Sequence, residues 1–439
     1  LFALLTKRTL EALIVGTLLS FIIVHGGGFF YPWMDAMFET LTDYDTMWAI
    51  MTCGLFGSLI ALFRRSKGTL GFTNLMLKFA TSAKKSLIAT WILGIIIFMD
   101  DYLNILTLGT AMRDITDKHK IPREMLAYVI DSTGAPVCVI LPFSTWAVFF
   151  SGVFASQPEV AALGVGEGMS LYTKIMPFIF YGWIAVIIVP LVALGIIPKL
   201  GPMKKAYQRT EETGKLYSDA SDKFNAPELE EFKQREGKLI NFVLPMIVLV
   251  TLTVWTEDLL VGVLAAIATC LILYLPTKLM TFNEFADDFM KGFCDLVPML
   301  AIIFGALFLQ RATSLIGLPA FVIETVKPYL NGEIYPAIAF LVVSGLSFIT
   351  GSNWGVPAVT VPIIVPLGIA LGANPFLVMS TVVSGGTFGS HACFYSDATV
   401  LTSSACGIEN MDHALTQIPY GAIAAGLAFI AYAITGFIF

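Results

Sequence analysis

The sequence predicts an all-α polytopic membrane protein made of two inverted-topology repeats, each with a re-entrant hairpin and a broken transmembrane helix. Of its 439 residues, 56% are hydrophobic and only 13% are charged, whereas soluble domains carry about 25% charged residues. Several apolar runs also reach the roughly 20 residues that a helix needs to cross a bilayer core. The chain is therefore expected to pass several times through a cell inner (plasma) membrane.

Four polar interruptions lie deep inside this apolar sequence, and their spacing indicates a repeat. Segments 98–104 and 350–355 lie about 250 residues apart, and each is followed about thirty residues later by a second polar break, at 131–136 and 384–391. An aspartate at the bilayer centre costs roughly 2.5–3.5 kcal/mol on insertion scales. Transporters built from internal repeats place their binding sites at such interruptions, near the membrane midplane.

The distribution of basic residues predicts that segment 86–113 is a re-entrant hairpin. Lys84 and Lys85 precede it and Arg113 and Lys118 follow, so the positive-inside rule places both of its ends in the cytoplasm. Arms of about a dozen residues, at roughly 1.5 Å per residue, reach the midplane of a core roughly 30 Å thick. We expect the turn at the adjacent aspartates 100 and 101.

The first repeat is expected to cover residues 1–199, with a broken helix at 124–151 and one helix missing before residue 1. Residues 200–238 are rich in Lys, Arg, Asp and Glu and are interpreted as a solvated cytoplasmic linker between the halves.

The second repeat is expected to cover residues 239–439, with its hairpin at 335–372 and its broken helix at 376–404. An odd number of spans in each half inverts the second copy, so this hairpin should enter from outside. The positive-inside rule gives weaker support for this orientation of the second half, because no Lys or Arg follows Lys327.

Polar side chains at these interruptions are the candidate site. Freed carbonyls together with Ser, Thr, Asn and Asp oxygens suit a hard cation, and a proton and Na⁺ can compete for one buried carboxylate. The expected ion- and substrate-binding residues are Asp100, Asp101, Asn104, Asp131, Ser132, Thr133, Ser144, Thr145, Ser352, Asn353, Trp354, Thr387, Ser390, His391, Ser396 and Asp397. The expected Na⁺ ligands among them are Asp101, Asn104, Asp131, Ser352, Asn353 and Asp397.

The four histidines are expected to have different roles. His391 lies within the second break and is interpreted either as a hydrogen-bonded core histidine or as a proton or substrate contact. His25, His119 and His413 lie near predicted membrane edges and are expected to be structural. Arg311 is expected to extend toward the membrane surface rather than to bind an anion.

Three stretches of the chain resemble the NhaC family of Na⁺/H⁺ antiporters, within the ion transporter superfamily. They are 100–104, 120–136, and 396–403 continued by 417–420. The resemblance implies inverted repeats, two opposed hairpins and a moving transport domain on a scaffold that is often dimeric. The run His391-Ala-Cys-Phe-Tyr395 departs from the acidic-Ser-Pro pattern usual before the Ser-Asp motif of the family.

The sequence thus predicts a secondary active transporter, an NhaC-type Na⁺/H⁺ antiporter that works by alternating access, and not an enzyme. A Na⁺- or H⁺-coupled symporter or exchanger of a small organic ion, such as an amino acid or a carboxylate, is the alternative. The expected partners are Na⁺, H⁺, the lipid bilayer and a second copy of the chain, with no nucleic acid and no cofactor. An intramembrane aspartyl protease would need a Gly-x-Gly-Asp motif, which the sequence lacks.

Overall fold

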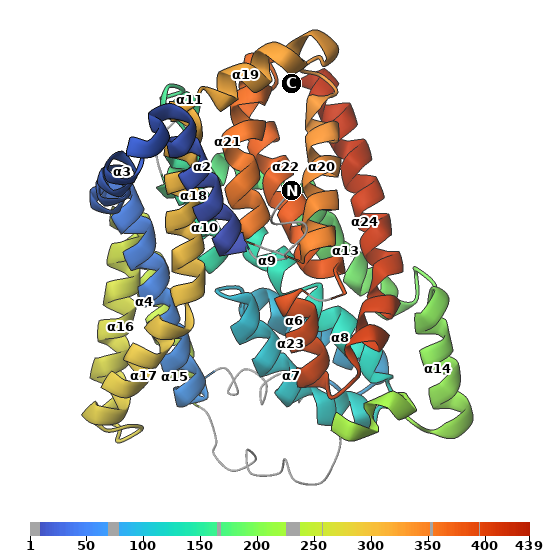
Figure 1. Cartoon of the computed structure of the whole chain (residues 1–439). Helices are drawn as coiled ribbons and strands as arrows, with labels where there is room; N and C mark the ends of the chain where they lie inside the picture. The colour runs from blue at the N-terminus through green and yellow to red at the C-terminus, as the bar shows by residue number, and fades with distance from the viewer. Residues whose placement is uncertain are drawn as a thin grey trace.

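The computed structural model describes residues 9–68, 79–164, 168–224, 238–256, 258–351, 354–394 and 396–439, and these residues form helices without a strand (Figure 1). The helices form two groups. A peripheral bundle consists of α2 (Thr9–His25), α3 (Phe30–Thr42), α4 (Tyr44–Ser66), α15 (Ile240–Thr256), α16 (Leu259–Tyr274), α17 (Phe282–Asp295) and α18 (Val297–Leu315).

The second group, the central unit, contains the segments that the sequence analysis singled out. It consists of α6 (Ala83–Ile96), α7 (Asp101–Lys118), α8 (Arg123–Asp131), α9 (Ala135–Ile140), α10 (Thr145–Ala155), α12 (Gly168–Ile175), α13 (Phe180–Leu194), α20 (Tyr335–Thr350), α21 (Gly355–Ala370), α22 (Pro375–Ala392), α23 (Asp397–Cys406) and α24 (Asn410–Ile438). Short helices α11 (Pro158–Ala161), α14 (Gly201–Thr213) and α19 (Leu318–Val326) connect or flank these elements.

Two helix pairs occupy the segments predicted as hairpins. The α6–α7 pair lies in the lower half of Figure 1 and the α20–α21 pair in the upper half, so their tips approach each other at mid-height. Asp100 begins α7 as its N-cap, and its Oδ1 accepts a hydrogen bond from the Leu103 amide at 2.9 Å. Gly351 ends α20 in the left-handed conformation, with φ 65°, which a glycine adopts without steric cost.

The two segments predicted as broken helices are interrupted, the first of them twice. It runs through α8, α9 and α10, and its last part bends by 41° from the preceding helix. The second runs through α22 and α23. In both, a serine caps the final helix: Ser144 accepts from the Ala147 amide at 3.0 Å and Ser396 from the Thr399 amide at 3.2 Å. The inverted relation between the halves stays a prediction.

Length and hydropathy identify the membrane helices only in part. Among the described residues, three helices are long and apolar enough to cross a bilayer (Thr46–Ser66, Phe282–Leu315 and Asn410–Ile438), or five if each bent pair counts as one span. The exterior is apolar: in α24 only 22% of the most apolar window is buried. Such a surface needs lipid around it, and the chain is a membrane protein.

The first part of the segment predicted as a solvated linker is docked on the central unit. The Arg209 guanidinium donates to both Glu124 oxygens, at 2.9 and 3.0 Å, and Glu124 is only 2% exposed. Farther along, the Ser221 hydroxyl accepts from the Glu409 amide at 2.8 Å, next to α24. Residues 201–224 therefore join the ends of α8 and α24.

A close helix contact in the second half gives a test of this packing. A Cβ at Gly389 of α22 would lie 2.1 Å from the Ser347 Cβ of α20, whereas a Cβ at Gly345 would meet nothing within 4 Å. Gly389→Ala should therefore force α20 and α22 apart and lower the thermal unfolding midpoint in detergent by several degrees.

Gly345→Ala is the matched control on α20. It should leave that midpoint unchanged or slightly higher, because alanine favours a helix over glycine by up to about 1 kcal/mol. Equal midpoints for the two variants would contradict the packing described here.

Candidate functional site

The first hairpin tip is fixed to the first broken helix by two hydrogen bonds from Thr145. The Thr145 hydroxyl donates to Asp100 Oδ2 at 3.2 Å, and the Thr145 amide donates to the Met99 carbonyl at 3.0 Å. Asp100 and Asp101 are 3% and 1% exposed, and Asp101 Oδ1 has no hydrogen-bond partner among the described residues. The tip thus holds two aspartates side by side and leaves one carboxylate oxygen unused.

Asn104 connects three free carbonyls at the same place. Its Nδ2 lies 2.7 Å from the Gly94 carbonyl, 3.0 Å from that of Ile97 and 3.1 Å from that of Thr133. The first two belong to the end of the first hairpin arm and the third to the break after α8. Because lipid offers no donor to such carbonyls, this one amide holds the tip and the break together, while its Oδ1 remains without a partner.

The two breaks meet at His391. Its ring nitrogens lie 2.8 Å from the Ser132 hydroxyl, in the first break, and 2.6 Å from the Tyr181 hydroxyl of α13. The ring is 1% exposed. The neutral imidazole, with one donor and one acceptor nitrogen, is fully satisfied by these two hydroxyls.

Asp131 pairs with a histidine that the sequence analysis expected to be structural. His413 of α24 places Nε2 3.0 Å from Asp131 Oδ2, and both side chains are fully buried. Gln417, one turn later, donates to the same oxygen at 2.7 Å and also to the His391 carbonyl. His413 therefore lies within the buried polar cluster and not at a membrane edge, and its structural role stays a prediction.

The histidine and glutamine stand four residues apart on one apolar helix, a spacing that puts both on one face. This spacing is the sequence signal that could have identified them.

The second hairpin reaches the first half through an aromatic contact. Trp354, at the start of α21, lies with its ring 4.5 Å from that of Trp146 and 5.0 Å from that of Phe149, measured between ring centroids. Trp146 follows Thr145, which binds Asp100. Ser352 and Asn353 lie outside the described residues.

The remaining predicted residues have local roles or face a cavity. The Ser144 hydroxyl donates to the carbonyl six residues earlier at 2.6 Å, and Ser396 does the same at 2.5 Å. Thr133 and Thr387 donate to their own helices, to Val129 and Val383, and the buried Ser390 hydroxyl has no partner among the described residues. Asp397 is exposed and lies beside Tyr102, whose hydroxyl donates to it at 3.3 Å.

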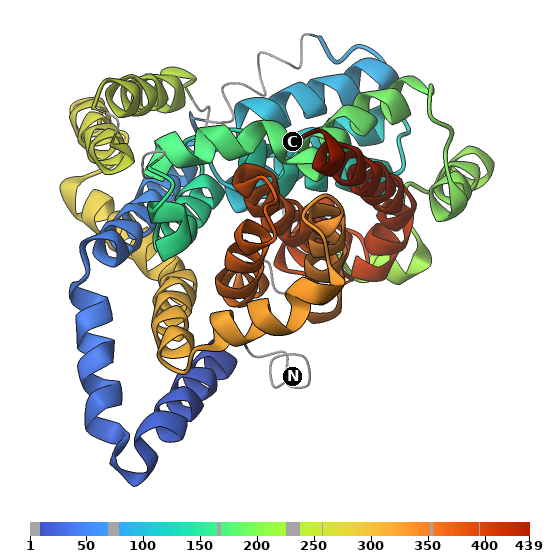
Figure 2. The ribbon, with the colours of Figure 1, turned by 90° about the horizontal axis from the view of Figure 1, so that it is seen from above.

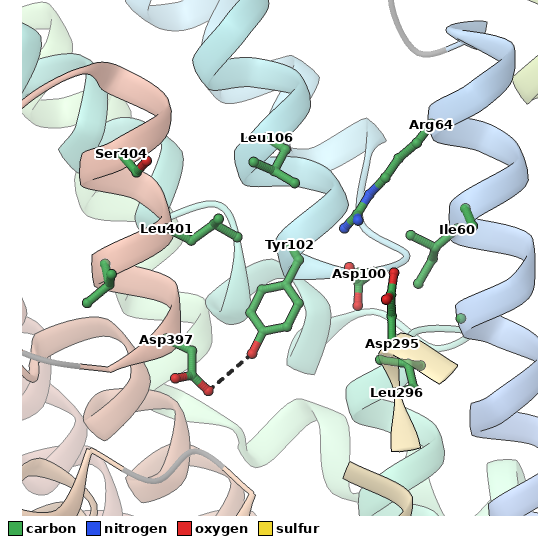
Figure 3. Close-up of a pocket in the computed structure, with 13 residues that line it drawn as sticks. Ile60, Arg64, Asp100, Tyr102, Leu106, Asp295, Leu296, Asp397, Leu401 and Ser404 are labelled. Carbon is green, nitrogen blue, oxygen red and sulfur yellow. Dashed lines mark hydrogen bonds between the residues drawn. The ribbon is translucent and has the colours of Figure 1, made fainter. Parts of the chain in front are cut away.

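A cavity of about 590 Å³ opens between the peripheral bundle and the central unit. Its polar lining, drawn in Figure 3, comes from both: Arg64 of α4 and Asp295 of α17 on one side, Asp100, Tyr102 and Asp397 on the other. The Arg64 side chain points toward Asp100 and Asp295, yet its guanidinium forms no hydrogen bond or ion pair with any residue in the described ranges. Three carboxylates face one guanidinium, so the lining favours cations.

No group of three or more His, Cys, Asp and Glu side chains that could hold a metal ion occurs among the described residues. The oxygen-rich donor set of the polar interior instead suits a hard cation.

Arg311, which was expected to extend toward the membrane surface, pairs with Glu39 of α3.

Comparisons with known proteins give a family and a fold. The family model described as the Na⁺/H⁺ antiporter family matches residues 137–437. An uncharacterized protein of Haemophilus influenzae is 25% identical over 480 aligned positions, which cover 100% of this chain and 89% of that protein.

Two solved structures share the fold. MtrF of Neisseria gonorrhoeae, described with a class of antimetabolite efflux pumps, superposes with a TM-score of 0.67 at 15% identity, over 97% of this chain and 94% of its own. The YdaH transporter of Alcanivorax borkumensis, described as having an unusual topology, gives a TM-score of 0.63 at 9% identity over 97% and 98%.

The role of Asn104 at the hairpin tip can be tested by its apolar isostere. Asn104→Leu leaves three buried carbonyls without their shared donor, and each unsatisfied buried group costs about 1–3 kcal/mol. We expect a clearly lower unfolding midpoint in detergent and faster amide exchange at residues 94–104.

Thr90→Val is the control within α6, because among the described residues the Thr90 hydroxyl bonds only the Ser86 carbonyl one turn earlier. It should change neither quantity much. An Asn104→Leu protein as stable as Thr90→Val would rule out the connecting role of this amide.

Proposed function

The chain belongs to the Na⁺/H⁺ antiporter family and is a secondary transporter, and from this premise we propose that it exchanges Na⁺ for H⁺ through the cavity that ends at the first hairpin tip. The observation that carries the proposal is the position of Asp100. This aspartate lines the open cavity and also belongs to the buried tip, beside Asp101 and Asn104. A cation can thus pass from water to the unpartnered oxygens of the tip without crossing an apolar layer.

We propose that the cavity opens toward the cytoplasm. Arg64 and Arg65 stand at the last turn of α4, and basic residues mark the cytoplasmic ends of membrane helices. In this state Na⁺ would leave the tip, or a proton would enter it, from the inside. The protein would be a multi-pass protein of an inner or plasma membrane, as its composition predicts.

Alternating access would come from movement of the central unit against the peripheral bundle. The bundle is tightly packed where it borders the cavity: a Cβ at Gly57 of α4 would lie 2.3 Å from the Gly292 carbonyl of α17. The opposite wall, made by α7 and α23, carries the tip residues. Rigid-body movement of that wall past α4 would close the cavity and expose the tip to the other side.

We also propose a homodimer, as the family resemblance implies. Helices α2 and α3 form an arm that projects from the body of the molecule (Figure 2). Ile23 and Tyr31 on this arm are 71% and 72% exposed, and a second copy or lipid can cover them.

A second candidate function is transport of a small organic ion. The cavity volume falls in the range of small-molecule sites, roughly 300–1,000 Å³, and far exceeds that of one Na⁺. The Arg64 guanidinium could bind a carboxylate of such an ion, while Asp295 and Asp397 could bind its amine. A zwitterion would satisfy both charges.

Purified protein in liposomes separates these functions. For Na⁺/H⁺ exchange, adding Na⁺ should drive protons across the membrane, and Asp100→Asn or Asp397→Asn should each weaken the apparent Na⁺ affinity at least tenfold, a change of about 1.4 kcal/mol. Asn still caps α7, so Asp100→Asn removes charge and keeps the local structure. Asp35→Asn, on exposed α3, is the control and should behave as wild type.

Arg64→Gln distinguishes the two candidates. It should raise the apparent Na⁺ affinity several-fold in the exchanger, because a competing positive charge beside Asp100 is removed. In a carrier of organic anions or zwitterions it should abolish uptake of the labelled solute. Wild-type liposomes that show no Na⁺-driven proton movement would contradict the exchange function.

A further inference from the structure

We propose that the outer face of α6 binds an anionic phospholipid, with the phosphate at Lys84 and Lys85 and an acyl chain along the apolar groove beside them. This site is separate from the transport cavity and does not depend on which ion or solute the protein carries. Three observations carry it: a second cavity, the order of charged and apolar residues along its wall, and the charge of its lining.

The second cavity, of about 540 Å³, lies where the start of α6 meets the end of α13. Its polar wall consists of Lys84, Lys85 and Thr81, and all three are exposed. Its other walls are apolar, and the lining, as far as the structure describes it, includes no acidic residue. The Trp91 indole of α6 donates to the Val186 carbonyl of α13 at 3.0 Å, which joins the two helices that border the cavity.

Charged and apolar residues follow one face of α6 in the order in which a lipid presents its headgroup and its chains. Lys84, Ile88 and Ile92 are four residues apart and line the cavity, and this spacing puts them on one face of the helix. Ile92 lies about 12 Å from Lys84 along the helix axis, at roughly 1.5 Å per residue. The basic end is the one that the positive-inside rule places at the cytoplasmic surface, so the apolar end extends into the hydrocarbon.

The apolar part of the groove remains open in the folded chain. Ile92 of α6 and Leu194 of α13 are 37% and 42% exposed, and Phe79, just before α6, is 60% exposed. Apolar surface of this kind is favourably covered by hydrocarbon and not by water. A free phosphate would leave it uncovered, whereas a phospholipid covers it with an acyl chain.

Lys84 and Lys85 do not stabilise the helix that they begin. They follow Ser82, the N-cap, in the first turn of α6, where a positive charge is unfavourable because the helix dipole is positive at that end. Neither lysine forms an ion pair with a residue in the described ranges. The Lys85 ammonium donates to the Thr81 hydroxyl at 3.3 Å. Both charges can therefore be neutralised by an anion from outside the chain.

Lys199, in the segment after α13, adds a third positive charge to this region. Its ammonium donates to the Val192 carbonyl at 2.6 Å. Burial and the positive charge of Lys84 lower the pKa of Lys199, so the two ammonium groups repel each other. A phosphate at Lys84 offsets this repulsion. Basic pockets of this kind, at the cytoplasmic side of membrane helices, suit anionic lipid headgroups.

A lipid titration of the purified, delipidated chain in detergent tests the proposal. Phosphatidylglycerol should raise the thermal unfolding midpoint by several degrees and approach saturation, because a ligand that binds the folded state stabilises it. Phosphatidylcholine with the same acyl chains lacks the net charge, and glycerol phosphate lacks the chains, so both should have little effect. Equal stabilisation by either of these two compounds would overturn the proposal.

A double substitution tests the residues. Lys84→Gln with Lys85→Gln should weaken the apparent affinity for phosphatidylglycerol about tenfold or more, because it removes both charges at the phosphate. Without lipid its unfolding midpoint should equal or exceed that of wild type, since the start of α6 loses two unfavourable charges. Unchanged affinity for phosphatidylglycerol would overturn the assignment.

Lys204→Gln with Lys205→Gln is the matched control, since it removes two adjacent exposed lysines from α14. It changes the net charge by the same amount and should bind phosphatidylglycerol as wild type does. Equal loss of affinity in the two double variants would show general attraction to a basic surface and overturn the site.

Amide exchange gives a second measurement on wild type. Phosphatidylglycerol should slow exchange in α6, whose far end supplies the Gly94 carbonyl that Asn104 binds, and should leave α16 unchanged. Exchange in α6 that is equal with phosphatidylglycerol and phosphatidylcholine would contradict the proposal. None of these measurements uses an ion gradient, so failure of the exchange function, seen as absent Na⁺-driven proton movement, is distinguished from failure of this inference.

Discussion

Every interruption of a membrane helix releases backbone groups that lipid cannot satisfy, and this constraint shapes the whole centre of the molecule. Ser144 and Ser396 cap the helices after the breaks, Asp100 caps α7, and Asn104 gathers three carbonyls. These side chains come from the starts of three helices, α7, α10 and α23. The breaks and the first hairpin tip consequently form one connected polar interior instead of separate defects.

Charge is distributed unevenly over this interior. The exposed acidic groups, Asp295 and Asp397, face the cavity, where water stabilises them. Asp131 is fully buried with His413 and Gln417 as donors. Asp100 lies between the two environments, at the cavity lining and yet 3% exposed. A cation moving inward thus meets carboxylates of decreasing hydration, which is the arrangement that allows H⁺ and Na⁺ to compete.

Sequence reasoning could predict the helical class, the family and the helix interruptions, because composition, basic residues and polar strings in apolar runs carry that information locally. The second break of the first broken helix, at residues 141–144, was not predicted, because a single proline and a single serine, Pro142 and Ser144, indicate a helix break only weakly within an apolar run. Contacts between segments that are distant in the sequence could not be predicted from it either. Asp131 and His413 are 282 residues apart, and hydropathy alone placed His413 at a membrane edge.

The same limit applies to the cavity and the docked segment. From the sequence, Arg64 is expected to be a charge at the cytoplasmic end of a helix. In the folded protein, where α4 packs against α17, its side chain points toward Asp100. From the sequence, Glu124 and Arg209 are expected to be solvated charges. In the structure they form a bidentate ion pair in which Glu124 is buried. Long-range packing, rather than local preference, decides these positions.

The most direct test of the account is the number of protons released when Na⁺ binds to the purified wild-type protein. Calorimetric titrations in buffers of different ionisation enthalpy measure this number at several pH values. Competition of Na⁺ and H⁺ for buried carboxylates predicts that Na⁺ binding releases protons, and that the number released per Na⁺ falls as the pH rises. Saturable Na⁺ binding without proton release at any pH would contradict the account.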